Sequence, residues 1–533
     1  MDTVFASKRA LIVDKQLEDL QTLRTLLLKL GLEQVFVASS VNMALTIFRE
    51  EQIDICFMVH DLGKGEKSGL QLLYEVQAEG LHRHGTAYVL VADAETSALM
   101  FGSLESSPDL CIDKPYQGAQ LRLSLERLLR MKQLLQPLDT CMDEARWPEA
   151  LALCEEKQAR FPALRVLLQR LRGIILLRLE RYQDAYEQFN ALLNEREQHW
   201  MRTGLGVAAY RLGEWVEAEN ALDQVIRQRQ VCIDAFDWLA RLLRLKGEVQ
   251  QAVNLLRKSV LLQPTIALLQ ARQGDAAARV QDWRLAVNAF RAAVRFGRYS
   301  AFQQPEYYFA LVQALRARMD QLQGEQADAA EAEAVQVLEQ AVKDFDHDPV
   351  ALFRSRLLLS DLLRQAGDPG RAEQAGRAAL ELFSNLPLEA QAQWLDLLVE
   401  GLESSEASEQ AKAIRQTLTP KTLSIDWARA NLKGMMHFRK AELSAARETF
   451  AQAYQQQPNN ASVSLNLLQT EVELLRQQQT DDPAATIRRC DDLLSRLHFA
   501  ALTQRQQHRY QVLAERLAAQ VQALMIRSAT GSE

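Results

Sequence analysis

The chain has 533 residues, of which 48% are hydrophobic and 25% charged, and its formal net charge is −7. It is too long for one compact core, since single cores stop growing at roughly 250 to 300 residues, and its composition is that of a folded protein rather than a disordered one. The negative charge gives no overall attraction to phosphate backbones or anionic lipid, so no direct nucleic-acid partner is expected.

Neither a signal peptide nor a membrane span is predicted. The opening stretch has one short apolar run that ends at Asp14, and no window approaches the ~18 uninterrupted apolar residues that a span needs. The cysteines are scattered, without the close pairs of a zinc site or the density of a disulfide scaffold. The histidines show no metal-ligand spacing, and the His82-Arg83-His84 triplet is interpreted as a solvated loop. A cytoplasmic location is expected.

Residues 1–130 alternate short apolar runs with amphipathic stretches. The apolar runs at 10–13, 34–38, 54–59, 87–92 and 110–112 predict strands. Leucines at steps of three and four predict helices between and after them, near 17–30, 41–51, 69–79, 95–105 and 118–135. Because each parallel crossover needs a helix to return the chain, this alternation predicts a small doubly wound α/β domain with a parallel sheet.

Charged residues follow three of the predicted strands. Asp14 comes after the first strand, Asp61 after the third and Lys114 after the fifth. Reactive groups of a doubly wound sheet gather outside the carboxyl ends of its strands, so these side chains are expected in one cleft. Acids and lysines also end strands simply because they meet solvent there, and the pattern alone leaves both interpretations open.

These residues resemble the receiver domain of two-component response regulators, over about the first 130 positions. Asp14 matches the first acid of the family pattern, Asp61 with Gly69 eight residues on matches the phosphoacceptor turn, and Lys114-Pro115 matches the element after the fifth strand. The resemblance implies a flavodoxin-like fold, phosphorylation of Asp61 by a histidine kinase or a small phosphate donor, and Mg²⁺ held by Asp14 and Asp61. Receivers often pair through their last two helices, so it also implies a homodimer.

The family pattern is incomplete in this chain. Lys15 replaces the second acid, Ala92 replaces the hydroxyl residue after the fourth strand, and Cys111 replaces the aromatic switch residue. Loss of a carboxylate to Lys15 is expected to weaken Mg²⁺ binding, because Mg²⁺ is held by carboxylate, phosphate and water oxygens. Two hypotheses follow: either Asp61 still accepts a phosphoryl group that Lys114 binds, or Lys15 and Lys114 neutralise Asp61 and the domain is a fixed docking module.

From about residue 131 the sequence repeats with a step near 34. An alanine recurs at steps of 35, 33, 34 and 34. The last four of these alanines have a small residue twelve positions before them and a Leu or Phe four positions after. Pro162 and Pro264 are placed to end the second helix of their pairs. The alanines are Ala150, Ala185, Ala218, Ala252 and Ala286. The pattern resembles the tetratricopeptide repeat, clearly over 131–300 and divergently over 301–533, where a helix from about 500 to 526 is expected to cap the stack.

Two segments bear on how the parts connect. The acidic, alanine-rich stretch 324–334 breaks the repeat step and is interpreted as an insertion rather than a helix extension. No Gly- or Ser-rich linker separates the α/β domain from the first repeat, so its last helix is expected to pack on the array or to continue into it. A change of state in the α/β domain could then tilt the array, and a rigid spacer is the alternative.

Stacked helix pairs bind peptide segments or protein surfaces on their inner face. The Lys and Asn clamp that grips a carboxyl terminus is absent, and the candidate partner-binding residues are Arg170, Trp200, Tyr210, Arg241 and Arg244. Trp200 and Tyr210 either anchor an apolar partner helix or pack within the stack.

The sequence therefore predicts a non-enzymatic, cytoplasmic bacterial signalling adaptor of a two-component phosphorelay, in which a degenerate receiver controls protein binding by a repeat array. The alternatives are a phosphorylation-independent scaffold and a regulator of transcription or RNA that acts through a partner. The array shows no Gly-rich phosphate loop, metal constellation or nucleophile motif, which argues against an enzyme.

Overall fold

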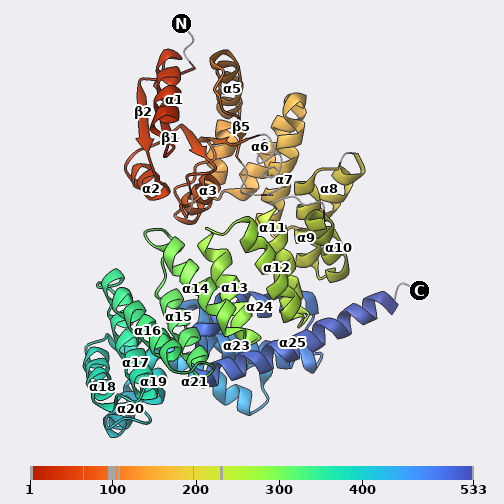
Figure 1. Ribbon diagram of the computed structural model, residues 1–533. Helices are drawn as coiled ribbons and strands as arrows, with labels where there is room; N and C mark the ends of the chain where they lie inside the picture. The colour runs from red at the N-terminus through yellow and green to blue at the C-terminus, as the bar shows by residue number, and fades with distance from the viewer. Residues whose placement is uncertain are drawn as a thin grey trace. The chain divides into compact units, whose positions relative to one another are not determined.

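The computed structural model describes residues 4–5, 7–63, 65–93, 104, 108–195, 197–227 and 232–530 (Figure 1). Two compact units divide the chain. The first comprises Met1–Leu242, Asn254–Gln270 and Arg295–Gln303, and the second Leu243–Val253, Ala271–Val294 and Gln304–Glu533. The first unit thus joins the α/β region to the first helix pairs, and the division does not follow the predicted domain boundaries after residues 130 and 300.

Five parallel strands form the sheet of the α/β region, in the order β2-β1-β3-β4-β5. Central strands are wholly buried because both faces of the sheet are covered, which explains their uninterrupted apolar sequences. The predicted doubly wound α/β fold with five strands is confirmed. The strands are β1 (Arg9–Val13), β2 (Gln34–Ala38), β3 (Ile55–Val59), β4 (Ala87–Val91) and β5 (Leu110–Ile112).

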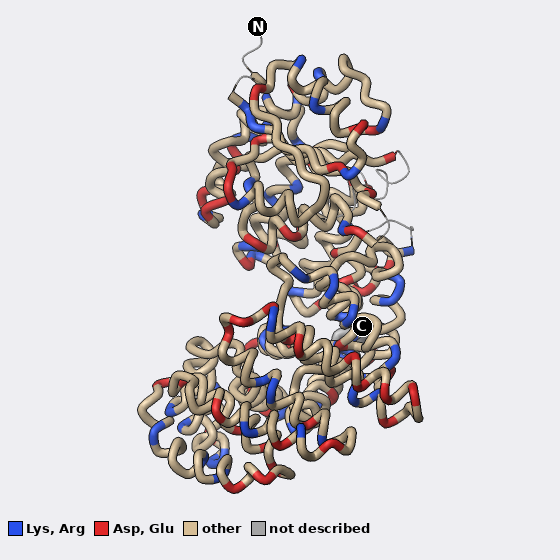
Figure 2. Tube along the Cα trace, turned by 60° about the vertical axis from the view of Figure 1, so that its left-hand side comes forward, with Lys and Arg blue, Asp and Glu red and all other residues tan. Residues whose placement is uncertain are grey.

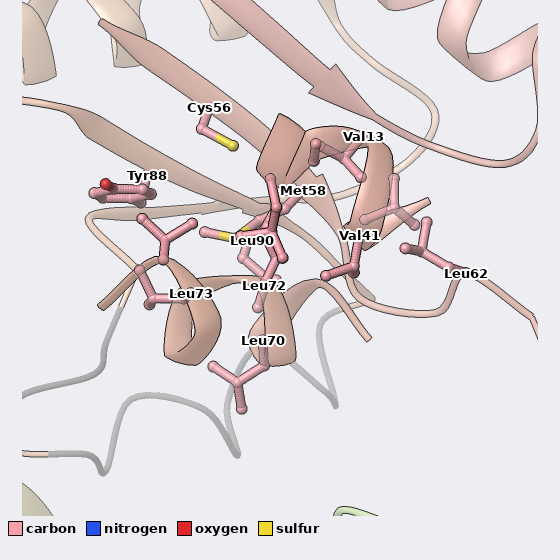
Figure 3. Close-up of a cluster of buried hydrophobic side chains, with 14 of the residues drawn as sticks. Val13, Val41, Cys56, Met58, Leu62, Leu70, Leu72, Leu73, Tyr88 and Leu90 are labelled. Carbon is pink, nitrogen blue, oxygen red and sulfur yellow. The ribbon is translucent and has the colours of Figure 1, made fainter. Parts of the chain in front are cut away.

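Helices cover both faces of this sheet. On one face, α1 (Leu17–Lys29) and α5 (Gly118–Asp143) bury leucines against β1, β3 and β4. On the other, α2 (Val41–Glu50) and α3 (Gly69–Ala78) pack in a cluster that includes Met58 and Leu90 (Figure 3). The helix expected over 95–105 lies, apart from Leu104, outside the described residues.

The helix α5 continues past the predicted boundary at 130 to Asp143 and leads directly to α6 (Trp147–Arg160). Its first half packs on the sheet, while Leu135, Leu138 and Met142 join a cluster built by the first repeat helices. Two arrangements were expected for this helix, packing on the array or continuation into it, and its second half packs on the first repeat helices.

Paired helices make up the rest of the chain. Every alanine of the predicted repeat register is fully buried, at 0% exposure. Gly173 shows why the register needs small residues, since an added Cβ there would clash with the ring of Phe189 in the partner helix. The helices are α7 (Arg165–Arg178), α8 (Tyr182–Glu195), α9 (His199–Leu212), α10 (Trp215–Arg227), α11 (Ile233–Leu245), α12 (Val249–Leu262), α13 (Ala267–Arg279), α14 (Trp283–Gly297), α15 (Pro305–Met319), α16 (Glu325–Asp344), α17 (Pro349–Gln365), α18 (Pro369–Ser384), α19 (Leu388–Gly401), α20 (Ser408–Thr422), α21 (Asp426–Arg439), α22 (Leu443–Gln456), α23 (Ala461–Arg476) and α24 (Pro483–Arg496).

The interpretation of 324–334 as an insertion is wrong, because all but its first residue form the start of α16. Ala330 and Ala334 are buried one turn apart, and Leu338 and Ala341 continue the same stripe. The segment is therefore an extended second helix of a pair. At the end of the chain, α25 (Gln504–Thr530) packs on α23 and α24 as the predicted cap. Within the described residues, no helix is long and apolar enough to cross a membrane.

Candidate functional site

Asp14 and Lys114 lie together at the carboxyl edge of the sheet. Asp14 is only 2% exposed, and its Oδ1 accepts a hydrogen bond from the Gln16 backbone at 2.9 Å while its Oδ2 accepts one from Lys114 Nζ at 2.9 Å. Lys114 Nζ also donates to Asp19 Oδ2 at 2.6 Å. Burial disfavours the Lys114 ammonium, but the hydrogen bonds to Asp19 and Asp14 outweigh it and raise the pKa of Lys114.

Asp19 was missed by the sequence reasoning. It lies in the first turn of α1, five residues after Asp14, where an acid is ordinarily explained as favourable to the helix dipole. Its position in the first turn of the helix that follows the first strand is the signal that could have identified it.

Asp61 is exposed, and its Oδ1 accepts a hydrogen bond from the Gly63 backbone at 2.8 Å. Lys15 forms an ion pair with Glu66 at 3.0 Å rather than with Asp61. Among the described residues, neither Lys15 nor Lys114 pairs with Asp61, so the hypothesised neutralisation of Asp61 by these lysines is not formed in this arrangement.

Gly69, the glycine that matched the phosphoacceptor turn, has a purely structural role as well. Its N–H donates to His60 O at 3.1 Å, and an added Cβ would clash with the Val59 carbonyl group. The turn after β3 therefore needs glycine for the close approach of α3 to the strand, whether or not Asp61 is phosphorylated.

The residues present do not fit Mg²⁺ in this arrangement. Both Asp14 oxygens accept from donors, one of them the Lys114 ammonium, and Lys15 Nζ lies 3.8 Å from the Cβ position of Gly63, beside the Asp61 turn. Mg²⁺ requires near-octahedral oxygen ligands and binds poorly where ammonium groups take their place. Ala92, after β4, is half-buried and offers a backbone N–H that donates to Ile112 O at 3.1 Å.

The aromatic residues predicted on the inner face of the array belong to its core. Trp200 is 5% exposed and Tyr210 1% exposed, so both pack within the stack, which was the second of the two interpretations. The Arg241 guanidinium lies over the rings of Tyr210, at 5.7 Å, and Trp238, at 5.2 Å. Arg244 Nε is buried without a hydrogen-bond partner among the described residues.

Arg170 has an unexpected partner, Leu104, which belongs to the α/β region. Arg170 Nε and Nη2 donate to Leu104 O at 3.0 and 2.8 Å, and the Leu104 N–H donates to Asp234 Oδ2 at 2.9 Å. The Leu104 side chain is 3% exposed and joins the buried cluster that contains Leu168 and Trp200. We call this arrangement of Arg170 and Asp234 around Leu104 the Leu104 clamp.

Further contacts hold the α/β region on the helix pairs of the first unit. Ile233, Ile266 and Leu269 share one buried cluster with α2 and α3. Arg295 Nη2 donates to Gly65 O, in the loop after Asp61, at 3.2 Å. The α/β region is thus joined to these helices by apolar packing as well as by hydrogen bonds.

Comparisons with known proteins bear on the array. The Tetratricopeptide repeat family model matches residues 203–264 and 332–387, both outside the α/β region. No curated protein gives a significant match. These two segments therefore match tetratricopeptide repeats, which supports the predicted repeat array.

Solved structures of repeat proteins are also similar. The C-terminal part of a TPR repeat-containing protein from Cytophaga hutchinsonii is 14% identical, with a TM-score of 0.33, over 55% of this chain and 98% of that one. A tetratricopeptide repeat protein from Parabacteroides merdae is 13% identical, with a TM-score of 0.28, over 54% and 98%. A human IFIT1 dimer with m7Gppp-AAAA is 14% identical, with a TM-score of 0.28, over 75% and 84%. These scores are too low to carry an argument about this chain.

Proposed function

We propose that this protein is a cytoplasmic protein-binding adaptor in which a receiver-like α/β region and a tetratricopeptide array form one regulated binding module. The observation that carries this proposal is the Leu104 clamp. Arg170, one of the predicted partner-binding residues, and Asp234 of α11 satisfy the C=O and N–H of one residue from the α/β region. This is how repeat and groove proteins hold an extended peptide, through its main chain with a pocket for one side chain.

The clamp gives the α/β region a defined role in binding. Leu104 of the same chain occupies the position that a partner segment would take. It offers an apolar side chain and backbone groups that hydrogen-bond to the array. A partner that presents an extended segment with one large apolar residue competes with Leu104 for Arg170 and Asp234. The α/β region therefore sets the affinity of the array without contacting the partner.

The cleft favours an adaptor that works without phosphorylation. Lys114 is committed to Asp14 and Asp19, Lys15 to Glu66, and Ala92 has no hydroxyl group to bind a phosphoryl oxygen. A receiver-like region with these pairs holds a single state, which suits a docking module. This proposal matches the phosphorylation-independent alternative drawn from the sequence.

Quantitative affinity capture tests the adaptor. The bait is the full chain, as the parent, as Leu104→Asp, and as Arg170→Met with Asp234→Asn. Leu104→Asp places a charge in the buried cluster and breaks the Leu104 clamp, so the amount of a specific partner captured should rise several-fold. The clamp double variant should capture less than the parent. Leu261→Asp, at an exposed leucine of α12, is the control and should capture as the parent does. Equal capture by all four baits would refute competition at the clamp.

Phosphorylation of Asp61 within a two-component relay is the second candidate. Its support is that Asp61 is exposed just after β3, at the same edge of the sheet at which Asp14 follows β1 and Lys114 follows β5. The test is incubation with acetyl phosphate or beryllium fluoride and Mg²⁺, followed by intact mass and tryptophan fluorescence. An adduct that disappears with Asp61→Asn would establish a working switch. No adduct in the parent, with one gained in Lys15→Asp, would assign the loss of phosphorylation to the lysine. The histidine kinase and the homodimer remain predictions.

A further inference from the structure

A second polar cluster lies at the opposite edge of the sheet, where the strands begin. His82 and His84 are in the loop before β4, and Asp143 is the last residue of α5. One ligand atom from each of these residues lies within 4.8 Å of the others. His84 Nδ1 is 2.6 Å from Asp143 Oδ1, and the His84 backbone N–H donates to the same oxygen at 2.9 Å.

We propose that His82, His84 and Asp143 bind one divalent transition-metal ion of the Zn²⁺ type, with water as the fourth ligand. Two imidazoles and a carboxylate form a donor set that suits Zn²⁺ or Co²⁺ better than Mg²⁺, which prefers oxygen ligands alone. Zn²⁺ bonds to imidazole nitrogen at about 2.0 Å, so donors of a tetrahedral site lie roughly 3.3 Å apart. Metal binding would widen the present 2.6 Å separation of His84 Nδ1 and Asp143 Oδ1 to that spacing by side-chain rotation.

The two imidazole rings are already oriented. The His82 ring stacks on the Tyr88 ring, with centroids 5.0 Å apart and planes 10° apart. The His84 ring packs edge-on against the His82 ring, with centroids 4.9 Å apart.

Asp139 gives an independent indication that a ligand belongs here. It lies one turn before Asp143 on α5 and is 5% exposed, yet its Oδ2 has no hydrogen-bond partner among the described residues. An ionised carboxyl group buried without a partner is costly, and buried polar atoms ordinarily have one. A metal-bound water that donates to Asp139 Oδ2 would supply that partner.

The charges around the cluster favour a dication. Lys132 Nζ pairs with Asp109 Oδ1 at 2.9 Å and donates to His84 O at 2.7 Å, so its charge is matched by Asp109. Asp139 and Asp143 then remain as two carboxylates for the metal ion to neutralise. A plain ion pair between His84 and Asp143 would explain their short contact, but it does not explain the partnerless oxygen of Asp139.

Metal binding at this position would tie two parts of the first unit together. The loop before β4 belongs to the α/β region, and Asp143 ends the helix that leads into the first repeat. An ion held by both would fix the α/β region against the start of the array. The proposed site is separate from the Asp61 cleft and does not depend on phosphorylation or on the Leu104 clamp.

Calorimetric titration with ZnCl₂ tests the site, using the full chain without a histidine tag and freed of metal with EDTA. The parent should bind one ion per chain with saturable heat. His82→Gln, His84→Gln and Asp143→Asn should each weaken binding at least about tenfold, and Asp139→Asn by a smaller factor. His347→Gln, at a fully exposed histidine beside Asp346, is the matched control and should bind as the parent does.

Two further measurements keep the result decisive. Co²⁺ should give the visible absorption of a tetrahedral site in the parent, and Zn²⁺ should raise its melting temperature. His82→Gln should lose both effects while keeping the His84–Asp143 contact, so its result stands even if the His84 or Asp143 variants fold poorly. Absence of saturable binding in the parent, or unchanged binding in His82→Gln, would overturn the proposal. If His347→Gln weakened Zn²⁺ binding as much as His82→Gln does, the binding would be to surface histidines, and this result would also overturn the proposal.

Discussion

Lys114 and Asp14, one hundred residues apart in the chain, form an ion pair with 2.9 Å between Nζ and Oδ2 at the carboxyl edge of the sheet. The pair joins the ends of β1 and β5, which are not neighbours in the sheet. Because Asp14 is almost completely buried, this lysine is a structural part of the α/β region as well as a match to the receiver pattern.

Lys114→Met should therefore destabilise the first unit strongly. It leaves the buried Asp14 carboxylate without its ammonium partner, and loss of one partner of a buried pair costs about 2 to 4 kcal/mol at this partial exposure. Lys15→Met removes an exposed pair and should cost less than about 1 kcal/mol. Urea unfolding of both variants measures the difference. Equal effects would contradict the structural role of Lys114, and Asp14→Asn should rescue part of the Lys114→Met loss.

Gly173→Ala should destabilise the array by about 1 to 3 kcal/mol, because the added methyl group meets the ring of Phe189 in a filled core. Gly370→Ala in α18 is the matched control. The nearest atom to its added Cβ is Asp368 Oδ1 at 3.9 Å, so it should be neutral or slightly stabilising through helix propensity. Thermal unfolding followed by circular dichroism compares the two. A destabilisation by Gly370→Ala as large as that by Gly173→Ala would show that packing is not the cause.

Asp139 should make the first unit less stable as pH rises from about 4 to 6. Burial raises the pKa of Asp139 to about 6, so the folded state holds a proton that the unfolded chain has already lost. The loss amounts to roughly 3 kcal/mol, since each pKa unit corresponds to about 1.4 kcal/mol. In EDTA, Asp139→Asn should be more stable than the parent at pH 7, and the difference should shrink below pH 4.

Asp143→Asn should change the folding stability at pH 7 in the opposite direction to Asp139→Asn. Burial alone would raise the pKa of Asp143, but the hydrogen bonds from His84 lower it overall. A carboxylate with a lowered pKa stabilises the folded state above its unfolded pKa and ceases to do so in acid. Asp143→Asn should therefore lose stability at pH 7 where Asp139→Asn gains it. The same sign for both variants would contradict this account.

His498 should stabilise the second unit more in mild acid than in base. Burial disfavours its imidazolium, but Asp275, with Oδ2 3.3 Å from Nδ1, raises the pKa of His498 overall, aided by Glu306 and opposed by Arg354. A raised histidine pKa contributes stability that is complete below about pH 6.5 and is lost as pH rises through the folded value. His498→Gln should lower the melting temperature at pH 5.5 and have less effect at pH 9. Equal effects of His498→Gln at the two pH values would contradict this account.

Local spacing was enough to predict most of the architecture. Ala150, Ala185 and their equivalents are buried as the repeat register required, since the contact between paired helices depends on residues three and four apart in each helix. The five strands followed from short apolar runs, because a strand covered on both faces of the sheet buries every residue. The one failed element, α16, was misread because its step differs, although its alanines already had helical spacing. Figure 2 shows acidic and basic residues interspersed along the backbone, as expected from a sequence that contains similar numbers of each.

By itself, the amino-acid sequence determined the strand and helix segments, the small residues of the repeat register and the positions of Asp14, Asp61 and Lys114 at strand ends. Only the tertiary structure decided which groups meet: Lys114 with Asp19, Arg170 with Leu104, and His84 with Asp143. The physical reason is that a single hydrogen bond or ion pair between residues 59 to 95 positions apart leaves no periodic trace along the chain. Helix packing repeats at every turn and strand packing at every second residue, so both leave a periodic pattern in the sequence.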